Sequence, residues 1–498
     1  MIRPHETQRQ ANGTERQRLL GCAFLQLKVV KTISRRKNDA DTPNKRTRKG
    51  SSSMNASSIR LERASVTRRR ALQLTATGAA VAGLGLRSAS AQSDATPVPG
   101  AGATPVSGDA VPELSAFDTI ITEAMAKWSL PGGQLAISHG DRLVFNRGYG
   151  YASIEGQEAV SPTSRFRIAS NTKPITGVAI QQLIDAGRLT LDTPVFPLLN
   201  LAGASNAPKD SRLDSITVEQ LLVHSGGWDS ASTGMDPQYL PYPLMASHIF
   251  SAEDPAEAKT IVRYMQGQPL DFDPGTKSAY SNFGYNVLGR VIEHVSGLPY
   301  EQFVIENTLT PVGITSMAIG GTTLAERLPE EVRYYSPEGL EPRPSVYPGE
   351  GYVPVGYGSY YVRSLDAHGG WISTAADLVR FALAIDGTRG TALLTPDSVK
   401  AMEETPRPPS AAAGAGNTAT TTGLAFNTTA ANGGWEWTHA GALEGSNCAW
   451  LLRTETASIA FLFNSLPQDL NSFFGEIIPT LQGELASTTT WPTTDLFA

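Results

Sequence analysis

The run Ser170-Asn171-Thr172-Lys173 holds the residue types that nucleophilic catalysis needs. A serine hydroxyl is a weak nucleophile until a neighbouring base removes its proton. A lysine one helical turn later lies on the same face, and it can act as that base if burial or nearby charge lowers its pKa. The N-terminus of a helix also offers backbone N–H groups to a developing oxyanion. The spacing therefore predicts Ser170 as nucleophile beside Lys173.

This spacing is not specific by itself. Ser34-Arg35-Arg36-Lys37 repeats it in the basic N-terminal region. The alternative for Ser170 is a helix-capping serine followed by a surface lysine. Further motifs are needed to decide between the two interpretations.

A second motif, Tyr280-Ser281-Asn282, follows a turn at Asp273-Pro274-Gly275 and precedes an expected helix. A loop–helix junction holds the tyrosine in place. A phenol close to a lysine is expected to ionise more easily and to act as a general base. The amide of Asn282 is suited to holding a substrate carbonyl.

A third motif lies near the end of an expected strand, where His439 is followed by the small residues Ala440, Gly441 and Ala442. Small side chains let a substrate backbone lie along the strand edge. The N–H of Ala442 is placed to supply a second oxyanion donor opposite that of Ser170. Taken singly, His439 is either a structural or a catalytic histidine.

In this order and at these separations, the three motifs resemble the serine β-lactamase and D-alanyl-D-alanine peptidase superfamily. The resemblance is closest to its class C β-lactamase, D-aminopeptidase and carboxylesterase branch, and it covers roughly residues 113–485. Further landmarks are Pro131-Gly132-Gly133, Arg167-Ile168-Ala169, residues 221–227, Pro274-Gly275, residues 311–314 and residues 369–374.

The resemblance implies a mechanism for these residues. Ser170 is acylated, Lys173 and Tyr280 share the proton transfers, and water releases the acyl group. Asn282 orients the substrate, while the N–H groups of Ser170 and Ala442 hold the oxyanion. No cofactor is implied.

One departure from the β-lactamase pattern narrows the expected activity. In β-lactamases the third motif is Lys-Thr-Gly, and its lysine faces a substrate carboxylate. In this chain His439 and Ala440 take the first two positions of that motif. A neutral imidazole binds a carboxylate less well than an ammonium does. We therefore expect a carboxylesterase or D-aminopeptidase acting on a small ester, amide or peptide. The alternatives are a class C-like β-lactamase, a non-catalytic protein that binds cell-wall peptide, and an exported structural domain.

The order of elements predicts an α/β (α+β) fold of the β-lactamase/transpeptidase type over residues 113–486, followed by a tail at 487–498. An antiparallel sheet is completed by both chain ends and flanked by N- and C-terminal helices, with an inserted, mostly helical region. The first expected helix begins near Glu113. The other expected helices cover residues 171–186, Val218–His224, Ala256–Gln266, Phe283–Ser296, Ala375–Ile385, Pro396–Glu403 and Leu470–Leu485. Expected strands are Gln134–Ser138, Leu143–Tyr149, Gly423–Asn427, Trp435–Ala440, Cys448–Arg453 and Ser458–Phe463.

The N-terminal region has the pattern of an export signal. Arginines at 68–70 precede an apolar run and small residues ending at Ala91, which is typical of a twin-arginine signal peptide over 54–91. Met54 is a suitable start, so residues 1–53 are either untranslated or a disordered basic arm. Residues 92–112 predict a flexible linker. We expect an exported protein without a stable membrane anchor.

Composition excludes several classes of protein. Residues 1–91 carry 19 Lys and Arg against 5 Asp and Glu, which leaves 22 basic and 42 acidic residues in the rest of the chain. The excess of acidic residues after residue 91 does not favour nucleic-acid binding. Cys22 and Cys448 predict no disulfide framework, with Cys448 buried as a small hydrophobe. The seven histidines show no metal-binding spacing.

Overall fold

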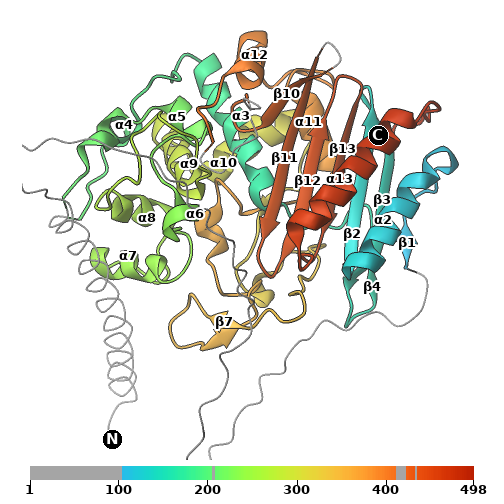
Figure 1. Ribbon diagram of the computed structural model, residues 1–498, viewed down its shortest axis with the longest axis horizontal. Helices are drawn as coiled ribbons and strands as arrows, with labels where there is room; N and C mark the ends of the chain where they lie inside the picture. Colours follow the sequence, from blue (N-terminus) through green and yellow to red (C-terminus); the bar gives the residue numbers. More distant parts are fainter. Residues whose placement is uncertain (1–103, 205–207, 411–421, 432–433, 498) are drawn as a thin grey trace, which may run out of the picture. The chain divides into compact units, whose positions relative to one another are not determined.

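A large antiparallel sheet is built from both ends of the chain, as the computed structural model of the protein shows (Figure 1). The structure describes residues 104–204, 208–410, 422–431 and 434–497. The strands of this sheet are β1 Val106–Ser107, β2 Gly132–His139, β3 Arg142–Ser153, β4 Glu158–Ala159, β10 Asn427–Ala431, β11 Gly434–Leu443, β12 Asn447–Arg453 and β13 Ala457–Phe463. Their order is β1-β3-β2-β13-β12-β11-β10, with β4 paired to β3.

Burial explains why the central strands form. Every residue of β12 and β13 is buried, and both strands are rich in aromatic and aliphatic side chains. Such continuous apolar runs suit strands that are covered on both faces. Strand β13 pairs with β2, so the C-terminal strands join the N-terminal hairpin in one sheet. Gly140 has φ +59° in the turn of that hairpin, a backbone conformation that glycine adopts without strain.

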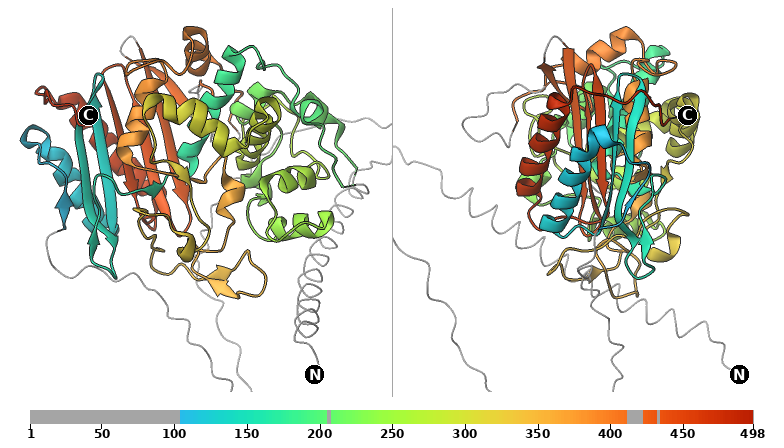
Figure 2. Two further views of the ribbon diagram at one scale, coloured as in Figure 1. Left: turned by 180° about the vertical axis from the view of Figure 1, so that it is seen from behind. Right: turned by 90° about the vertical axis from the view of Figure 1, so that its right-hand side faces the viewer.

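Helices cover both faces of the sheet. Helices α2 (Ser115–Trp128) and α13 (Leu470–Ser487) lie side by side on one face (Figure 2). They form a separate hydrophobic core with the sheet, in which Phe117 and Phe473 are completely buried. Helix α11 (Ala375–Ala384) packs on the opposite face. The two terminal helices thus anchor the sheet that carries the third motif.

A mostly helical region adjoins the sheet, as the sequence predicts (Figure 1). Its helices are α3 Thr172–Asp185, α4 Val195–Leu199, α5 Val218–Leu222, α6 Ser230–Thr233, α7 Tyr242–Phe250, α8 Ala258–Met265, α9 Asn282–Ser296, α10 Tyr300–Val304 and α12 Pro396–Glu404. Short strands in the same part of the chain are β5 Phe166–Arg167, β6 Ala318–Ile319, β9 Trp371–Ser373, β7 Arg343–Pro344 and β8 Tyr352–Val353. Helix α3 is buried around nearly its whole circumference and packs against α9, so it forms the centre of this region. None of the described helices is long and apolar enough to cross a bilayer.

The predicted α/β fold class is confirmed, but the expected strand Gly423–Asn427 is wrong. The backbone turns there, and the strand β10 starts only at Asn427. Gly423 has φ +103° and Ala425 has φ +65°, which no extended strand accommodates. The turn lets Ala425 pack against Gly177 of α3.

Both ends of the described domain contact the rest of it. The end of the expected linker, from residue 104, is structured, because Val106 pairs with Tyr149 on the open edge of β3. The expected tail docks as well: the ring of Trp491 stacks on His139 with centroids 4.4 Å apart. The predicted signal peptide and the segment 1–53 lie outside the described residues.

Candidate active site

Ser170 lies in a tight turn that leads into α3. The turn is a 3-10 helix, Ala169–Asn171, and α3 follows at once. Ala169 has φ +47°, a left-handed conformation that costs a non-glycine residue energy and is typical of functional turns. Neighbouring strands hold the turn, since Ile168 N donates to Trp371 O at 3.0 Å. The serine hydroxyl is thereby presented at a rigid, half-buried position.

Lys173 is fully buried beside Ser170. Its Nζ donates to Ser170 Oγ at 3.1 Å, to Asn282 Oδ1 at 2.9 Å and to the carbonyl oxygen of His368 at 3.0 Å. Burial lowers the pKa of Lys173 to about 7, and the negative charge of Asp236 opposes that shift. A large fraction of Lys173 is therefore neutral near pH 7 and able to accept the serine proton.

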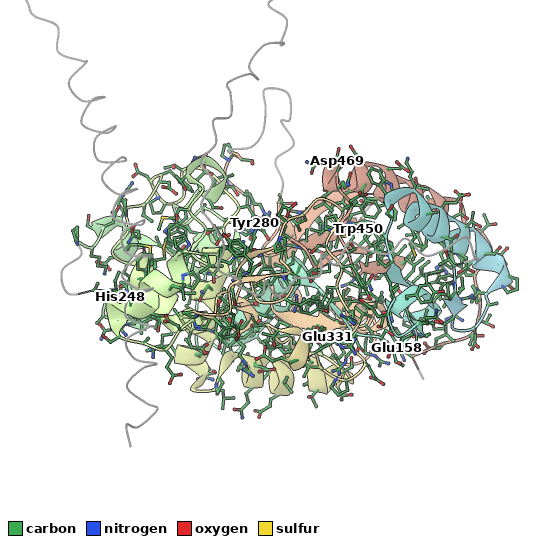
Figure 3. The ribbon with its side chains drawn as sticks, turned by 90° about the horizontal axis from the view of Figure 1, so that it is seen from below. Glu158, His248, Tyr280, Glu331, Trp450 and Asp469 are labelled. Carbon is green, nitrogen blue, oxygen red and sulfur yellow. The ribbon has the colours of Figure 1, made fainter. Side chains whose placement is uncertain are left out.

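Tyr280 contacts Ser170 from the opposite side. Its hydroxyl donates to Ser170 Oγ at 2.7 Å, and the side chain lies between the helical region and the large sheet (Figure 3). Nearly half of this residue is exposed, 48%. The Nζ of Lys173 lies 4.7 Å from its ring centroid. Ser170 thus has a contact with each of the two predicted proton-transfer residues.

The expectation that Lys173 makes Tyr280 ionise more easily is wrong in direction. Burial raises the pKa of Tyr280 above its ordinary value of 10, and the charge of Asp236 raises it further. The phenol therefore stays protonated at neutral pH. Tyr280 is therefore suited to donating a proton and Lys173 to accepting one.

His224 holds the loop that carries Tyr280. Its Nδ1 accepts a hydrogen bond from Ser281 N at 3.1 Å, and the rings of His224 and Tyr280 lie 4.5 Å apart. The carbonyl of His224 accepts from Ala279 N at 2.8 Å. Burial lowers the pKa of His224 well below its usual range, so the imidazole is neutral. His224 therefore packs beside the site and supports the loop that carries Tyr280.

Asn282 is the first residue of α9. Its Oδ1 accepts from Lys173, and its Nδ2 donates to Asp236 Oδ2 at 2.8 Å. The amide thus links two charged side chains, which the sequence did not indicate. One N–H of the amide remains for further contacts.

His439 of β11 is buried and neutral. Burial and the nearby charge of Lys173 lower the pKa of His439 to about 3. Its Nδ1 lies 2.8 Å from the carbonyl oxygen of Ala440, which can only accept, so Nδ1 carries the proton. Nε2 is then an acceptor. A neutral ring whose free nitrogen is an acceptor offers a substrate carboxylate neither a free hydrogen-bond donor nor a positive charge.

Gly441 brings β11 against the nucleophile turn. A Cβ added at Gly441 would lie 2.3 Å from Ile168 O and 3.2 Å from Ser170 N. Only glycine permits this approach. Ala442 is the next residue along β11, opposite Cys448 of β12. The structure therefore places Ser170, Lys173, Tyr280, Asn282 and the third motif around one point.

Comparison with known proteins agrees with this geometry. The family model described as Beta-lactamase matches residues 117–472, which contain all three motifs. The chain belongs to the beta-lactamase family. Ser170, Lys173 and Tyr280 all lie within the matched residues.

Relatives of this beta-lactamase-family chain include Protein flp of Staphylococcus aureus (strain COL), 30% identical over 204 residues. That match covers 40% of this chain and 37% of Protein flp. A putative D-alanyl-D-alanine carboxypeptidase of Escherichia coli O157:H7 is 29% identical over 228 residues, which are 42% of this chain and 50% of that protein. The chain therefore matches half or less of the length of either relative.

Solved structures share the fold. The D-amino acid amidase from Ochrobactrum anthropi SV3 has a TM-score of 0.58 and 21% identity, covering 76% of this chain and 99% of that chain. The octameric penicillin-binding protein homologue from Pyrococcus abyssi has a TM-score of 0.55 and 22% identity, and the match covers 74% of this chain and 77% of that chain. At these identities the likeness shows the beta-lactamase-like fold alone.

Two residues beside the motifs carry no sequence signal. Asp236 lies between α6 and α7 and reaches the site through Asn282. Arg407 donates to Gly423 O at 2.9 Å, to Asn427 Oδ1 at 2.8 Å and to a further backbone carbonyl. It is close enough to lower the pKa of His439, and among the described residues no carboxylate forms an ion pair with it. Neither residue belongs to a motif, so only the folded chain reveals them.

Proposed function

We propose that the protein is a serine hydrolase that acts through an acyl-enzyme on Ser170. One observation carries this proposal: Ser170 Oγ is contacted both by Lys173, whose pKa is lowered to about 7, and by the protonated hydroxyl of Tyr280. A base and an acid on one nucleophile are what acyl transfer requires. Membership of the beta-lactamase family supports the same reaction class.

The steps follow from the positions of these groups. Neutral Lys173 takes the proton of Ser170 as Oγ attacks the substrate carbonyl. The backbone N–H groups of Ser170 and Ala442 bind the developing oxyanion. Tyr280 donates its proton to the leaving oxygen or nitrogen and regains one from the Lys173 ammonium. Water then attacks the acyl-serine as Lys173 accepts its proton, and Lys173 returns that proton to Ser170 Oγ as the acid product leaves.

The proposed substrates are esters or D-amino-acid amides, ahead of β-lactams. A neutral His439 with an acceptor Nε2 lacks the cation that a β-lactam carboxylate would meet in the Lys-Thr-Gly form of the third motif. The fold likeness to a D-amino acid amidase is consistent with this order. Carboxylesterase or D-aminopeptidase-like activity is therefore the leading proposal.

A three-substrate panel tests the proposal. The mature protein is assayed on a short-chain ester, a D-alanine amide and a chromogenic cephalosporin, and Ser170 is probed with a fluorophosphonate followed by mass spectrometry. Ser170→Ala is expected to abolish every activity and the adduct, whereas Ser215→Ala, an exposed serine outside the site, is expected to change neither. Failure to form an adduct at Ser170 would defeat the enzyme proposal in favour of a binding protein. Cephalosporin turnover exceeding the other two would reverse the substrate order.

Arg407 favours a second candidate, a peptidase or penicillin-binding activity on substrates with a carboxylate. Its guanidinium lies close to His439 and has only neutral acceptors among the described residues. Two of its five N–H donors are left over for a ligand. Arg407→Ala is then expected to raise KM for a D-alanyl-D-alanine peptide and to leave KM for an uncharged ester unchanged. Equal effects on both substrates would eliminate this candidate.

Export is part of the proposal. The arginines at 68–70, the apolar run that follows and the small residues ending at Ala91 support a twin-arginine signal. We expect the N-terminal peptide of the mature protein to begin at Gln92. Recovery of residues 54–91 on the protein outside the cytoplasm would contradict cleavage, and replacing Arg68 and Arg69 by lysine is expected to retain the protein inside.

A further inference from the structure

Asp236 is a half-buried acidic group that faces the catalytic lysine across a single amide. Its Oδ2 accepts from Asn282 Nδ2 at 2.8 Å, and its Oδ1 accepts from Gln238 N at 3.2 Å. Among the described residues, no lysine or arginine lies within ion-pair distance of this carboxylate. The carboxylate is therefore held by neutral donors. Among the described residues no cation beside it neutralises its charge, so the charge can act on the site.

The amide of Asn282 has one orientation between its two neighbours. An ammonium can only donate hydrogen bonds, and an ionised carboxylate can only accept them. Lys173 Nζ therefore donates to Oδ1 of Asn282 at 2.9 Å, while Asp236 accepts from Nδ2 of the same amide. Asp236 in this way fixes which end of Asn282 meets the lysine and where Lys173 Nζ is held relative to Ser170.

Asp236 also supplies the carboxylate charge that acts on Lys173. Burial lowers the pKa of Lys173, and Asp236 is the group that raises it in return. The other titratable groups around the lysine are uncharged at neutral pH: His224, His368 and His439, whose pKa values burial lowers, and Tyr280 and Tyr285, whose pKa values burial raises. Arg407, near His439, is a cation and cannot offset the loss of the carboxylate. No second described anion could replace Asp236.

We propose that Asp236 is a positioning residue, which acts through Asn282 to orient Lys173 and to set its balance between ammonium and amine. This inference rests on the proposed acyl-serine function. It assigns the tuning of the catalytic base to a residue 46 positions before Asn282 that belongs to none of the three motifs and reaches the site through Asn282.

Two variants distinguish the two roles of Asp236, which are to orient Asn282 and to supply negative charge near Lys173. Asp236→Asn keeps an oxygen acceptor for Asn282 Nδ2 but removes the charge, so Lys173 loses its protons more readily. The acid limb of the pH–rate profile then moves to lower pH by about one unit, and the plateau rate falls because a weaker base drives proton transfer less well. Asp236→Ala also leaves Asn282 Nδ2 without its acceptor, so we expect a further loss of about tenfold or more in kcat.

Asp229→Asn is the matched control. Asp229 is a buried carboxylate in the same loop region, but it pairs with Lys277 and is not among the groups that act on Lys173. Asparagine also preserves its role as the cap of α6, where Asp229 accepts from Ser232 N. We expect this variant to share any loss of stability while keeping the wild-type acid limb.

The test measures three quantities from pH 5 to 10 on the full-length mature protein: the rate of Ser170 phosphonylation by a fluorophosphonate, kcat/KM for a short-chain ester, and the rate of competitive acetylation of Lys173 with acetic anhydride. We expect all three profiles to move to lower pH in Asp236→Asn and to stay in place in Asp229→Asn. Unmoved profiles in Asp236→Asn, or equal shifts in both variants, would overturn the role of Asp236. Wild-type protein that is never acylated would instead contradict the proposed function, and the Lys173 labelling profile would still show whether Asp236 tunes the lysine.

Discussion

Gly441→Ala tests whether the close approach of β11 to the nucleophile turn is needed for catalysis. The new methyl would lie 2.3 Å from Ile168 O and 3.2 Å from Ser170 N. Carbon normally keeps about 3.3 Å from a carbonyl oxygen, so the strand and the turn must separate by about 1 Å. A displacement of about 1 Å at a reacting centre costs about 10²-fold in rate, or about 2.7 kcal/mol. Loss of an oxyanion donor is of similar size, about 10²- to 10³-fold.

The assay compares kcat for a short-chain ester and the acylation rate of Ser170 in Gly441→Ala with a matched glycine variant. Gly475 of α13 has no heavy atom within 4 Å of an added Cβ, so Gly475→Ala is expected to keep full activity and to raise Tm slightly. Both variants are checked for native circular dichroism. A Gly441→Ala protein within about threefold of wild-type kcat would refute the placement of the oxyanion donors at Ser170 and Ala442.

Three further predictions concern the base, the acid and the packing of α3. Because burial lowers the pKa of Lys173 to about 7 and only its neutral form accepts the serine proton, kcat/KM is expected to rise with pH through about 7; a limb near pH 10 would contradict this assignment. Tyr280→Phe keeps the ring but removes the proton donor, so kcat is expected to fall by about 10²-fold with KM little changed, and wild-type kcat would exclude Tyr280 as the acid. Gly177→Ala places a Cβ 2.4 Å from that of Ala425, so urea unfolding is expected to show a loss of about 1–3 kcal/mol in the free energy of unfolding, whereas unchanged stability would show that the turn yields.

Local sequence patterns predicted most of the elements that hold the site. Apolar spacing located α3 and α9 to within a residue or two of their observed ends, because side-chain periodicity is a local property. Tyr280 at a loop–helix junction followed from the turn residues before it. The turn at Ala425 was missed, because its left-handed backbone is stabilised by contact with Gly177, which is distant in the chain.

Protonation and orientation were not predictable in the same way. The raised pKa of Tyr280 results from burial, which the sequence expectation of an easily ionised phenol left out. The sequence indicated the amide of Asn282 as a substrate contact but not its hydrogen bonds to Lys173 and Asp236. Both differences come from groups that enter the site only when distant segments pack together.

The amino-acid sequence by itself determined which chemical groups this protein offers for the proposed reaction: the serine, the lysine, the tyrosine and a glycine-containing strand end, each recognisable within a few residues. Only the tertiary structure decided that the pKa of Lys173 is lowered and that of Tyr280 raised, which suits them to the proposed roles of base and acid, and that His439 is neutral. The physical reason is that a pKa depends on desolvation and on charges such as Asp236, which are set by the packing of the whole domain rather than by neighbours in the chain.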